Sequence, residues 1–267
     1  MCGRYFQQRG PASVAGYFET VNPLPNLGAS WNRAPTQDAL VVRRHPEPGA
    51  RHLDPLRWGL VPRWAKDTSG AGKMINARSE TLAEKPTFRD AFAKRRCLVT
   101  ADGFYEWRTE GKAKQPFAIA MADGAPMALA GLWEGWRTPD GEILRTCTIV
   151  TGEANAKLSA MHHRMPMILP REAWAAWLGE VPAEPSELHA LLRPCPEDWL
   201  AVWPVSPRVN KVRENDATLL ARDPLAMPPA GLDDTPPDFP DRPTASAPDR
   251  VRPAAQAGNP PPPASPA

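Results

Sequence analysis

The sequence has no run of about 18 apolar residues, which is the length that a membrane-spanning helix needs, so we expect no transmembrane helix and no membrane partner. Its first twenty residues include charged side chains but no apolar stretch typical of a secretory signal peptide. These two absences predict a cytoplasmic protein.

Cysteine is scarce and scattered, with four residues in 267 and no C-x-x-C pair. This spacing gives little support to a zinc site or a thioredoxin-type motif. The chemistry that the motifs below imply requires no metal and no organic cofactor. Cys97, Cys147 and Cys195 lie in strand-like or proline-flanked segments, where buried free cysteine behaves as a small hydrophobic residue. Cys2 has no such explanation.

Net charge is also small, at +2, and does not identify a partner. Its distribution is slightly more informative. Residues 221–267 contain four Arg and six Asp, so residues 1–220 carry a net charge of +4. This mildly favours a polyanionic partner.

The sharpest change in composition falls near residue 221. Residues 221–267 hold 14 of the 34 prolines and a single aromatic residue, Phe239. Such a segment buries too little apolar surface to offset the entropy of ordering it. We therefore predict one domain over residues 1–220, followed by a disordered, partly polyproline II-like tail over 221–267.

Within residues 1–220, short segments rich in apolar and β-branched residues outnumber helical ones. The expected strands are Ala39–Arg44, Leu53–Leu60, Cys97–Ala101, Phe117–Met121, Met127–Trp133, Leu144–Thr151 and Met165–Leu169. The expected helices are Ser13–Thr20, Phe88–Lys94, Glu153–Ala160, Arg171–Leu178 and Ser186–Leu192. Helices do not alternate regularly with strands, so we predict an α+β fold on a curved, barrel-like, mainly antiparallel sheet with flanking helices.

The chain begins Met1-Cys2-Gly3-Arg4, and a small second residue favours removal of the initiator Met. Cys2 would then carry a free amine and a thiol on adjacent carbons. This pair condenses with an aldehyde, first to an imine and then to a thiazolidine ring. An α-amine with a pKa of about 7.7–8.0 is partly neutral at pH 7. We expect the thiol pKa, about 8.5 when free, to fall beside Arg4 or a protonated His. The alternative is an incidental residue in a frayed terminus.

Three further segments contain residues suited to chemistry. Asn76 offers amide donors and an acceptor, and the Arg78 guanidinium can bind a phosphate through two N–H groups. The alternative is that Asn76 caps a helix and that Arg78 is solvated. In Phe104-Tyr105-Glu106-Trp107, strand alternation places Phe104 and Glu106 on one face.

The Glu106 carboxylate among apolar neighbours is expected either to be paired with an Arg or to have a raised pKa suited to acid–base catalysis. The adjacent His162 and His163 lack metal-ligand spacing. They are either titrating acid–base groups or ordinary histidines.

Nine short motifs, in this order along residues 1 to about 218, together resemble the SRAP family (SOS-response-associated peptidases, also described as abasic-site processing proteins). They are M-C-G-R (1–4), W-N-R-A-P-T (31–36), R-W-G-L-V-P-R-W (57–64), I-N-A-R-S-E-T (75–81), A-D-G-F-Y-E-W (101–107), K-Q-P-F (114–117), I-V-T (149–151), M-H-H-R-M-P (161–166) and W-P-V-S (203–206) leading into V-N-K-V (209–212). Each motif is weak alone. The tail lies outside the resemblance.

The resemblance implies that Cys2 becomes the N-terminal residue and forms a thiazolidine with the ring-opened sugar of an abasic site in single-stranded DNA. It implies that Asn76 orients Cys2 and the sugar, that Glu106 acts as acid and base, and that His162 assists the same proton transfers. His163 occupies a position that is often acidic in the family. The implied DNA and active-site contacts are Arg4, Asn32, Arg78 and Arg164, with Trp64 and Trp107 as stacking or wedging aromatics. We expect a monomer that associates with the nucleoid when bound to DNA.

Two other functions remain open from the sequence. In a peptidase or amidohydrolase with an N-terminal nucleophile, Cys2 would attack a carbonyl and Asn76 would contribute to an oxyanion hole. Removal of Met1 by the chain itself would be one such activity. In a non-catalytic single-strand binding module, the Trp and Arg residues would matter and Cys2 would not.

Overall fold

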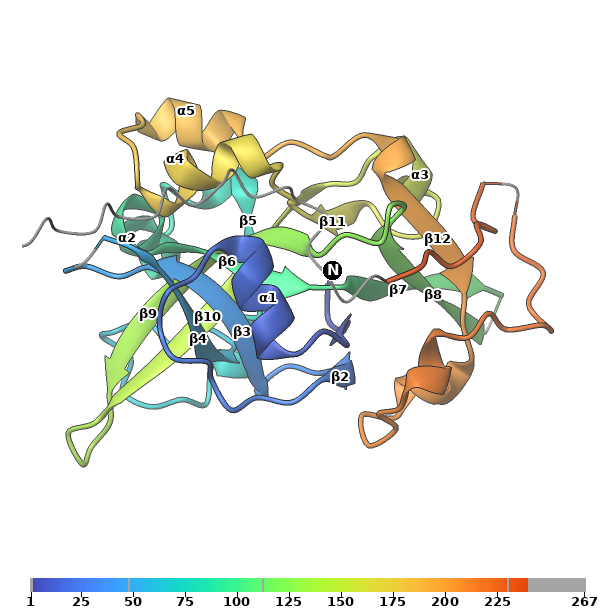
Figure 1. Ribbon diagram of the computed structural model, residues 1–267, viewed down its shortest axis with the longest axis horizontal. Helices are drawn as coiled ribbons and strands as arrows, with labels where there is room; N and C mark the ends of the chain where they lie inside the picture. Colours follow the sequence, from blue (N-terminus) through green and yellow to red (C-terminus); the bar gives the residue numbers. More distant parts are fainter. Residues whose placement is uncertain (1, 48, 112, 230, 240–267) are drawn as a thin grey trace, which may run out of the picture.

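The computed structural model describes residues 2–239 except residues 48, 112 and 230. Its centre is a closed barrel of five strands in the order β10-β4-β3-β6-β9, closed by pairing of β9 with β10 (Figure 1). The barrel strands are β3 (Asp38–Arg44), β4 (Arg51–Trp58), β6 (Arg96–Ala101), β9 (Met127–Arg137) and β10 (Ile143–Glu153). Neighbours are antiparallel except β4 and β10, which are parallel.

A second antiparallel sheet has the order β12-β8-β7-β1-β2. Its strands are β1 (Tyr5–Gln7), β2 (Ser30–Arg33), β7 (Gly103–Glu110), β8 (Ala113–Met121) and β12 (Leu200–Pro204). Two short strands extend the barrel sheet along β10: β5 (Asn76–Arg78), which is parallel to it, and β11 (Arg164–Pro166), which is antiparallel. The start of the chain therefore lies close to β7 in one sheet and β5 in the other (Figure 1).

Helices are few and short. The α-helices are α1 (Pro11–Phe18), α2 (Pro86–Lys94), α3 (Ala156–Ser159), α4 (Trp174–Leu178) and α5 (Pro185–Ala190). The 3-10 turns are η1 (Ala71–Lys73), η2 (Ser79–Thr81), η3 (Arg171–Ala173), η4 (Glu197–Trp199), η5 (Pro207–Asn210) and η6 (Ala217–Leu220). α4 ends where Gly179 adopts a φ of 77°, a left-handed conformation that favours glycine. No helix among the described residues is both long and apolar enough to cross a membrane.

Two apolar clusters flank the second sheet, as alternation along β7 requires. Phe104 faces the larger cluster, which fills the barrel and includes Cys2, Cys97 and Cys147. Tyr105 faces a smaller cluster under the segment that follows β12. Cys97, Cys147 and Cys195 are buried free thiols, as predicted.

The predicted fold class is confirmed: a barrel and a mainly antiparallel sheet with few helices. All seven predicted strand segments overlap observed strands, although β11 ends at Pro166 and Ile168 makes only an isolated bridge. The helix predicted over Glu153–Ala160 is wrong in its first residues, because β10 continues to Glu153 and Asn155 caps the short α3 by accepting from Leu158 N.

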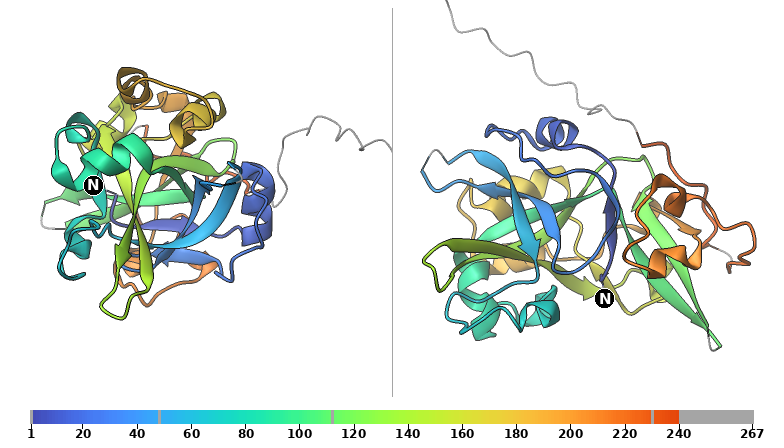
Figure 2. Two further views of the ribbon diagram at one scale, coloured as in Figure 1. Left: turned by 90° about the vertical axis from the view of Figure 1, so that its left-hand side faces the viewer. Right: turned by 90° about the horizontal axis from the view of Figure 1, so that it is seen from below.

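Within residues 221–239, which composition placed in the tail, several described residues contact the domain. Leu232 is 2% exposed within the main core, and Asp234 Oδ2 accepts a hydrogen bond from Val202 N at 2.7 Å. Figure 2 shows the segment after β12, coloured orange to red, beside β7 and β8. The remainder of the predicted tail, residues 240–267, lies outside the described residues.

Candidate active site

Cys2 is held at the junction of the two sheets. β1 pairs antiparallel with β7, with Tyr5 opposite Phe104, and Tyr105 N donates to Arg4 O at 2.9 Å. Because the two strands are antiparallel, the residues that precede Tyr5, back to Cys2, lie beside the β7 residues that follow Phe104, including Glu106. The Cys2 side chain is completely buried.

Asn76 approaches Cys2 from the other sheet. It begins β5, opposite Ile149 of β10, and its Nδ2 donates to Cys2 O at 2.8 Å. Its Oδ1 is buried and accepts no hydrogen bond from any residue that the structure describes. Buried amide oxygens are usually paired, so this acceptor beside Cys2 is positioned for a donor from a ligand. The alternative of a helix cap does not apply, because Asn76 lies in a strand.

Glu106 lies on the β7 face that points toward Cys2. Its side chain is 8% exposed, and Oε1 accepts a hydrogen bond from Trp107 N at 3.1 Å. Gly103 allows β7 to come this close to β1, because a Cβ there would overlap the Phe6 ring and Ile119 O. The alternation predicted for this strand is observed, with Phe104 and Tyr105 in different apolar clusters.

Burial raises the pKa of the Cys2 thiol to about 12, and the negative charge of Glu106 acts in the same direction. The predicted decrease of this pKa is therefore wrong. Arg4 does not offset burial, since its guanidinium is directed toward Asn32, with Nη1 donating to Asn32 Oδ1 at 2.7 Å. The thiol is protonated at neutral pH, so a nearby base must accept its proton before the sulfur can form a bond to carbon.

His162 lies in the turn between α3 and β11. Its Nδ1 accepts from Arg164 N at 2.9 Å, which places the proton of the neutral ring on Nε2. The ring stacks on His163, with centroids 4.4 Å apart. Burial lowers the pKa of His162, whereas the charge of Glu106 raises it. The negative charge of Glu106 therefore acts on both His162 and Cys2.

Arg4 and Asn32, predicted to contact DNA, are hydrogen-bonded within the protein; Asn32 is buried and Arg4 is half-buried. Asn32 is 1% exposed, and its Nδ2 lies 2.7 to 3.2 Å from three backbone oxygens, those of Val209, Lys211 and Glu214. Arg4 Nη1 also donates to Val209 O at 2.9 Å. These two side chains therefore hold the segment 209–214 against the domain.

This segment contributes a residue that was not predicted as part of the site. Asn210 Oδ1 accepts a hydrogen bond from Trp107 Nε1 at 2.7 Å. This bond fixes the half-buried indole of Trp107, the residue that follows Glu106 in β7. The V-N-K-V motif was the only sequence signal for it.

The other predicted DNA contacts differ in whether their side chains already bind protein groups. Arg164 makes a bidentate ion pair with Glu80, and its Nη2 also donates to Thr151 O at 2.5 Å. The hydrogen bond from Arg164 lowers the pKa of Glu80. Arg78, at the end of β5, is exposed, and Trp64 is 65% exposed in the loop after β4. Exposed aromatic and basic groups of this kind are available to a single strand.

No group of three or more His, Cys, Asp or Glu side chains that could hold a metal ion occurs among the residues described by the structure. The side chains described around Cys2 supply a thiol, an amide, a carboxylate and an imidazole.

Known proteins are similar to this chain over most of its length. The abasic site processing protein YoqW of Bacillus subtilis strain 168 is 40% identical over 223 residues, covering 82% of this chain and 99% of that protein. The abasic site processing protein HMCES of Gallus gallus is 34% identical over 229 residues, covering 74% of this chain and 68% of that protein.

Solved structures are also similar to this chain. A crystal structure of a protein from Bacteroides thetaiotaomicron has a TM-score of 0.76 and 26% identity, covering 83% of this chain and all of that one. A second, from Bordetella bronchiseptica, has a TM-score of 0.67 and 30% identity, covering 77% of this chain. The family model described as SOS response associated peptidase (SRAP) matches residues 1–212. The chain therefore belongs to the SOS response associated peptidase family.

Proposed function

We propose that this protein processes abasic sites in single-stranded DNA by capturing the sugar aldehyde on Cys2 after removal of Met1. The observation that carries the proposal is that Asn76 donates to Cys2 O, while the charge of Glu106 acts on both the Cys2 thiol and the His162 ring. The names of the curated relatives support an abasic site as the substrate. A pocket for a sugar without a base also needs no flipping of an intact nucleotide.

The reaction forms two bonds to one carbon. The Cys2 amine attacks the aldehyde carbon of the ring-opened sugar, and the carbinolamine loses water to give an imine. The thiol sulfur then adds to the imine carbon, its proton is transferred to the nitrogen, and a thiazolidine ring closes. The net change is the loss of one water from protein and DNA. Holding the aldehyde beside both nucleophiles supplies effective molarity.

Each neighbouring side chain has a role in this sequence. Asn76 Oδ1, which has no donor among the described residues, accepts a hydrogen bond from the amine or from a sugar hydroxyl. Glu106 exchanges protons during ring opening and loss of water. His162 accepts the thiol proton, because burial lowers its pKa and favours its neutral form.

Two exposed side chains hold the DNA strand. Arg78 binds a phosphate, and Trp64 stacks on a base or wedges between bases; each stacked base contributes about 1–3 kcal/mol. Trp107, held by Asn210 on the other face of β7 from Glu106, offers a second aromatic group to the DNA. The contribution to DNA binding is indirect for three other side chains, because each already binds protein groups: Arg4, Asn32 and Arg164.

Intact-mass measurement before and after incubation with an abasic oligonucleotide tests this proposal. We expect the starting protein to lack Met1, and the product to gain the oligonucleotide mass less one water. Cys2→Ala should abolish the product, whereas Cys195→Ala, which removes another buried thiol, should keep it. An oligonucleotide without the lesion is the second control.

Other outcomes would point to the alternative functions. Retention of Met1, with the Cys2 nitrogen in a peptide bond, would contradict thiazolidine formation. An acyl group on Cys2 would indicate an N-terminal nucleophile hydrolase. Equal affinity for intact and abasic strands, with no adduct after denaturation, would indicate a non-catalytic binding module.

A further inference from the structure

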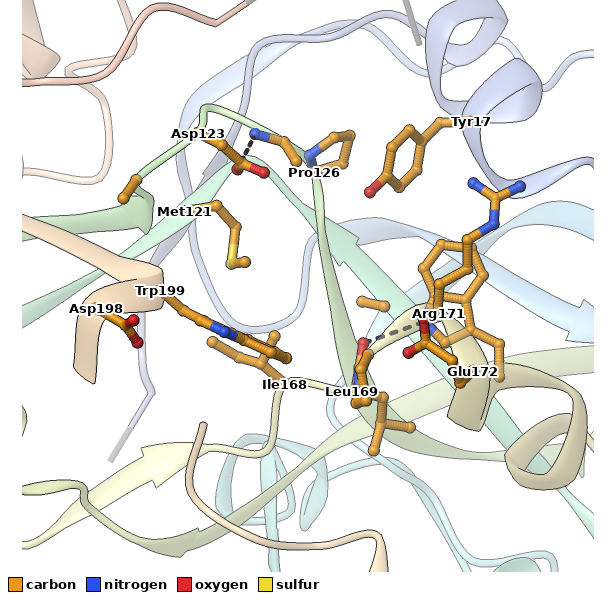
Figure 3. Close-up of a pocket in the computed structure, with 15 residues that line it drawn as sticks. Tyr17, Met121, Asp123, Pro126, Ile168, Leu169, Arg171, Glu172, Asp198 and Trp199 are labelled. Carbon is orange, nitrogen blue, oxygen red and sulfur yellow. Dashed lines mark hydrogen bonds between the residues drawn. The ribbon is translucent and has the colours of Figure 1, made fainter. Parts of the chain in front are cut away.

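A pocket of about 380 Å³ lies away from Cys2, between α1, the β8–β9 turn, the segment that leads into α4, and η4. Tyr17 points toward this pocket from α1, and Trp199 lies across from it (Figure 3). Its apolar lining consists mainly of Tyr17, Met121, Pro126, Ile168, Trp174 and Trp199. None of these residues takes part in the site around Cys2.

The charges on this pocket are mainly negative. Asp123, Glu172 and Asp198 contribute three carboxylates. The single cation in the lining, Arg171, is paired with Glu19 at 2.5 Å and lies over the Trp174 ring at 5.5 Å. Burial raises the pKa of the Tyr17 hydroxyl, and the charge of Asp123 raises it further. Aromatic side chains beside carboxylates suit a segment that presents proline rings and arginine.

The described chain ends beside one wall of this pocket. The Phe239 ring packs edge-on against Phe6 with centroids 6.0 Å apart, and the Arg9 guanidinium lies 6.0 Å from the Phe239 ring centre. Arg9 Nη2 in turn donates to Gly124 O at 2.6 Å. Gly124 follows Asp123 in the turn that forms the wall. A single side chain, Arg9, therefore bridges Phe239 and the pocket wall.

The residues that follow Phe239 have the composition that the pocket fits. The tripeptide Pro-Asp-Arg occurs at 240–242 and again at 248–250, and Pro243, Arg252 and Pro253 complete two proline–arginine stretches. Residues 240–267 contain three Arg and two Asp, so their charge is opposite to that of the pocket. A polyproline II segment rises about 3.1 Å per residue, so four residues span about 12 Å. That length exceeds the 6.0 Å between the Phe239 ring centre and the Arg9 guanidinium, which itself contacts Gly124 O in the wall.

We propose that residues 240–253 of the chain dock in this pocket, with proline rings against Tyr17 and Trp199 and arginines beside Asp123, Glu172 and Asp198. The mode is that of proline-rich peptides in aromatic-lined grooves, with the ligand supplied by the same chain. Because the segment is tethered at Phe239, its effective concentration is high and a weak intrinsic affinity suffices. The docked segment would occupy a surface that is otherwise open to proline-rich segments of other proteins.

Site-specific photocrosslinking in the full chain tests this docking. Tyr17→p-benzoylphenylalanine places a photoreactive ketone in the pocket, and Glu172→p-benzoylphenylalanine provides a second, exposed position if the first variant folds poorly. After irradiation, peptide mapping by mass spectrometry should identify crosslinks to residues 240–253 in protein of monomer mass. Ile143→p-benzoylphenylalanine, in the β9–β10 hairpin and outside the pocket, is the matched control and should not give them.

Charge variants sharpen the result. Replacing Arg242, Arg250 and Arg252 by Ala should lower the crosslink yield about tenfold, as expected for the loss of three surface ion pairs. Replacing Asp241 and Asp249 by Asn should not lower it. Crosslinks only to residues outside 240–253, or no crosslink from either pocket position, would overturn the proposal. Crosslinks to the tail found only at dimer mass would replace docking within one chain by exchange between two copies.

Discussion

Two asparagines in different regions of this protein, the buried Asn32 and the half-buried Asn76, differ in one respect. Asn32 has polar partners for both ends of its amide: its Nδ2 lies within 3.2 Å of three backbone oxygens and its Oδ1 accepts from Arg4. Asn76 donates to Cys2 O, but its Oδ1 is buried without a donor among the described residues. A fully bonded buried amide is explained by structure alone, whereas one that lacks a partner is expected where a ligand binds.

The largest effect should follow from Asn32→Ala. It removes the amide that holds the backbone oxygens of Val209, Lys211 and Glu214, and leaves Arg4 without its side-chain acceptor. We expect the free energy of unfolding to fall by about 3 kcal/mol, measured by chemical denaturation. A loss of crosslinking without any loss of stability would instead place Asn32 among the DNA contacts.

Asn76→Ala should show the opposite pattern. It removes one hydrogen bond to Cys2 O, so we expect a loss of about 1 kcal/mol in stability but a roughly 10- to 100-fold slower adduct formation. Single-turnover crosslinking rates measure the second effect. Asn76→Asp is the matched variant, because it keeps an acceptor at Oδ1 and removes the donor to Cys2. Equal rates for Asn76→Ala and the parent protein would break the contrast between the two asparagines.

The buried thiol that Asn76 adjoins should also show itself in the pH dependence of stability. Burial raises the pKa of Cys2 to about 12, above its unfolded value of about 8.5. A raised folded pKa contributes stability that is present below the unfolded pKa and is lost as the pH rises through this interval. Above pH 8.5, unfolding free energies should therefore fall less steeply in Cys2→Ala than in the parent. Parallel profiles would indicate that the thiol is solvated.

The smallest expected effect concerns two arginines, one with protein partners and one exposed to solvent. Arg164 is paired with Glu80, whereas Arg78 is exposed. Arg78→Ala should reduce the salt dependence of binding to intact single strands by about 0.7 in the log–log slope, the value for one phosphate contact. Arg164→Ala should leave this slope almost unchanged. Fluorescence anisotropy over a salt series measures both, and an unchanged slope for Arg78→Ala would remove it from the phosphate contacts.

Much of the fold was predictable, because strand signals are local. Apolar and β-branched segments bounded by Gly, Pro or Asp overlap seven observed strands, and alternation correctly separated Phe104 from Tyr105. Four strands were missed: β1, β2 and β5, which are short and mix polar and apolar residues, and β12, which is apolar but short. Their strand character depends on partners far along the chain, such as β1 between β2 and β7.

The sequence alone was sufficient to identify the family, because nine short motifs occur in one order along the chain. The roles of Cys2, Asn76, Glu106 and His162 came from that resemblance and stay predictions. The sequence did not predict the ionisation of Cys2 or the engagement of Arg4, Asn32 and Arg164, since burial and hydrogen-bond partners arise only when distant segments meet. Residues 221–239 illustrate the same limit. Their composition predicts a tail, yet Leu232 and Asp234 find partners in a core that other segments build.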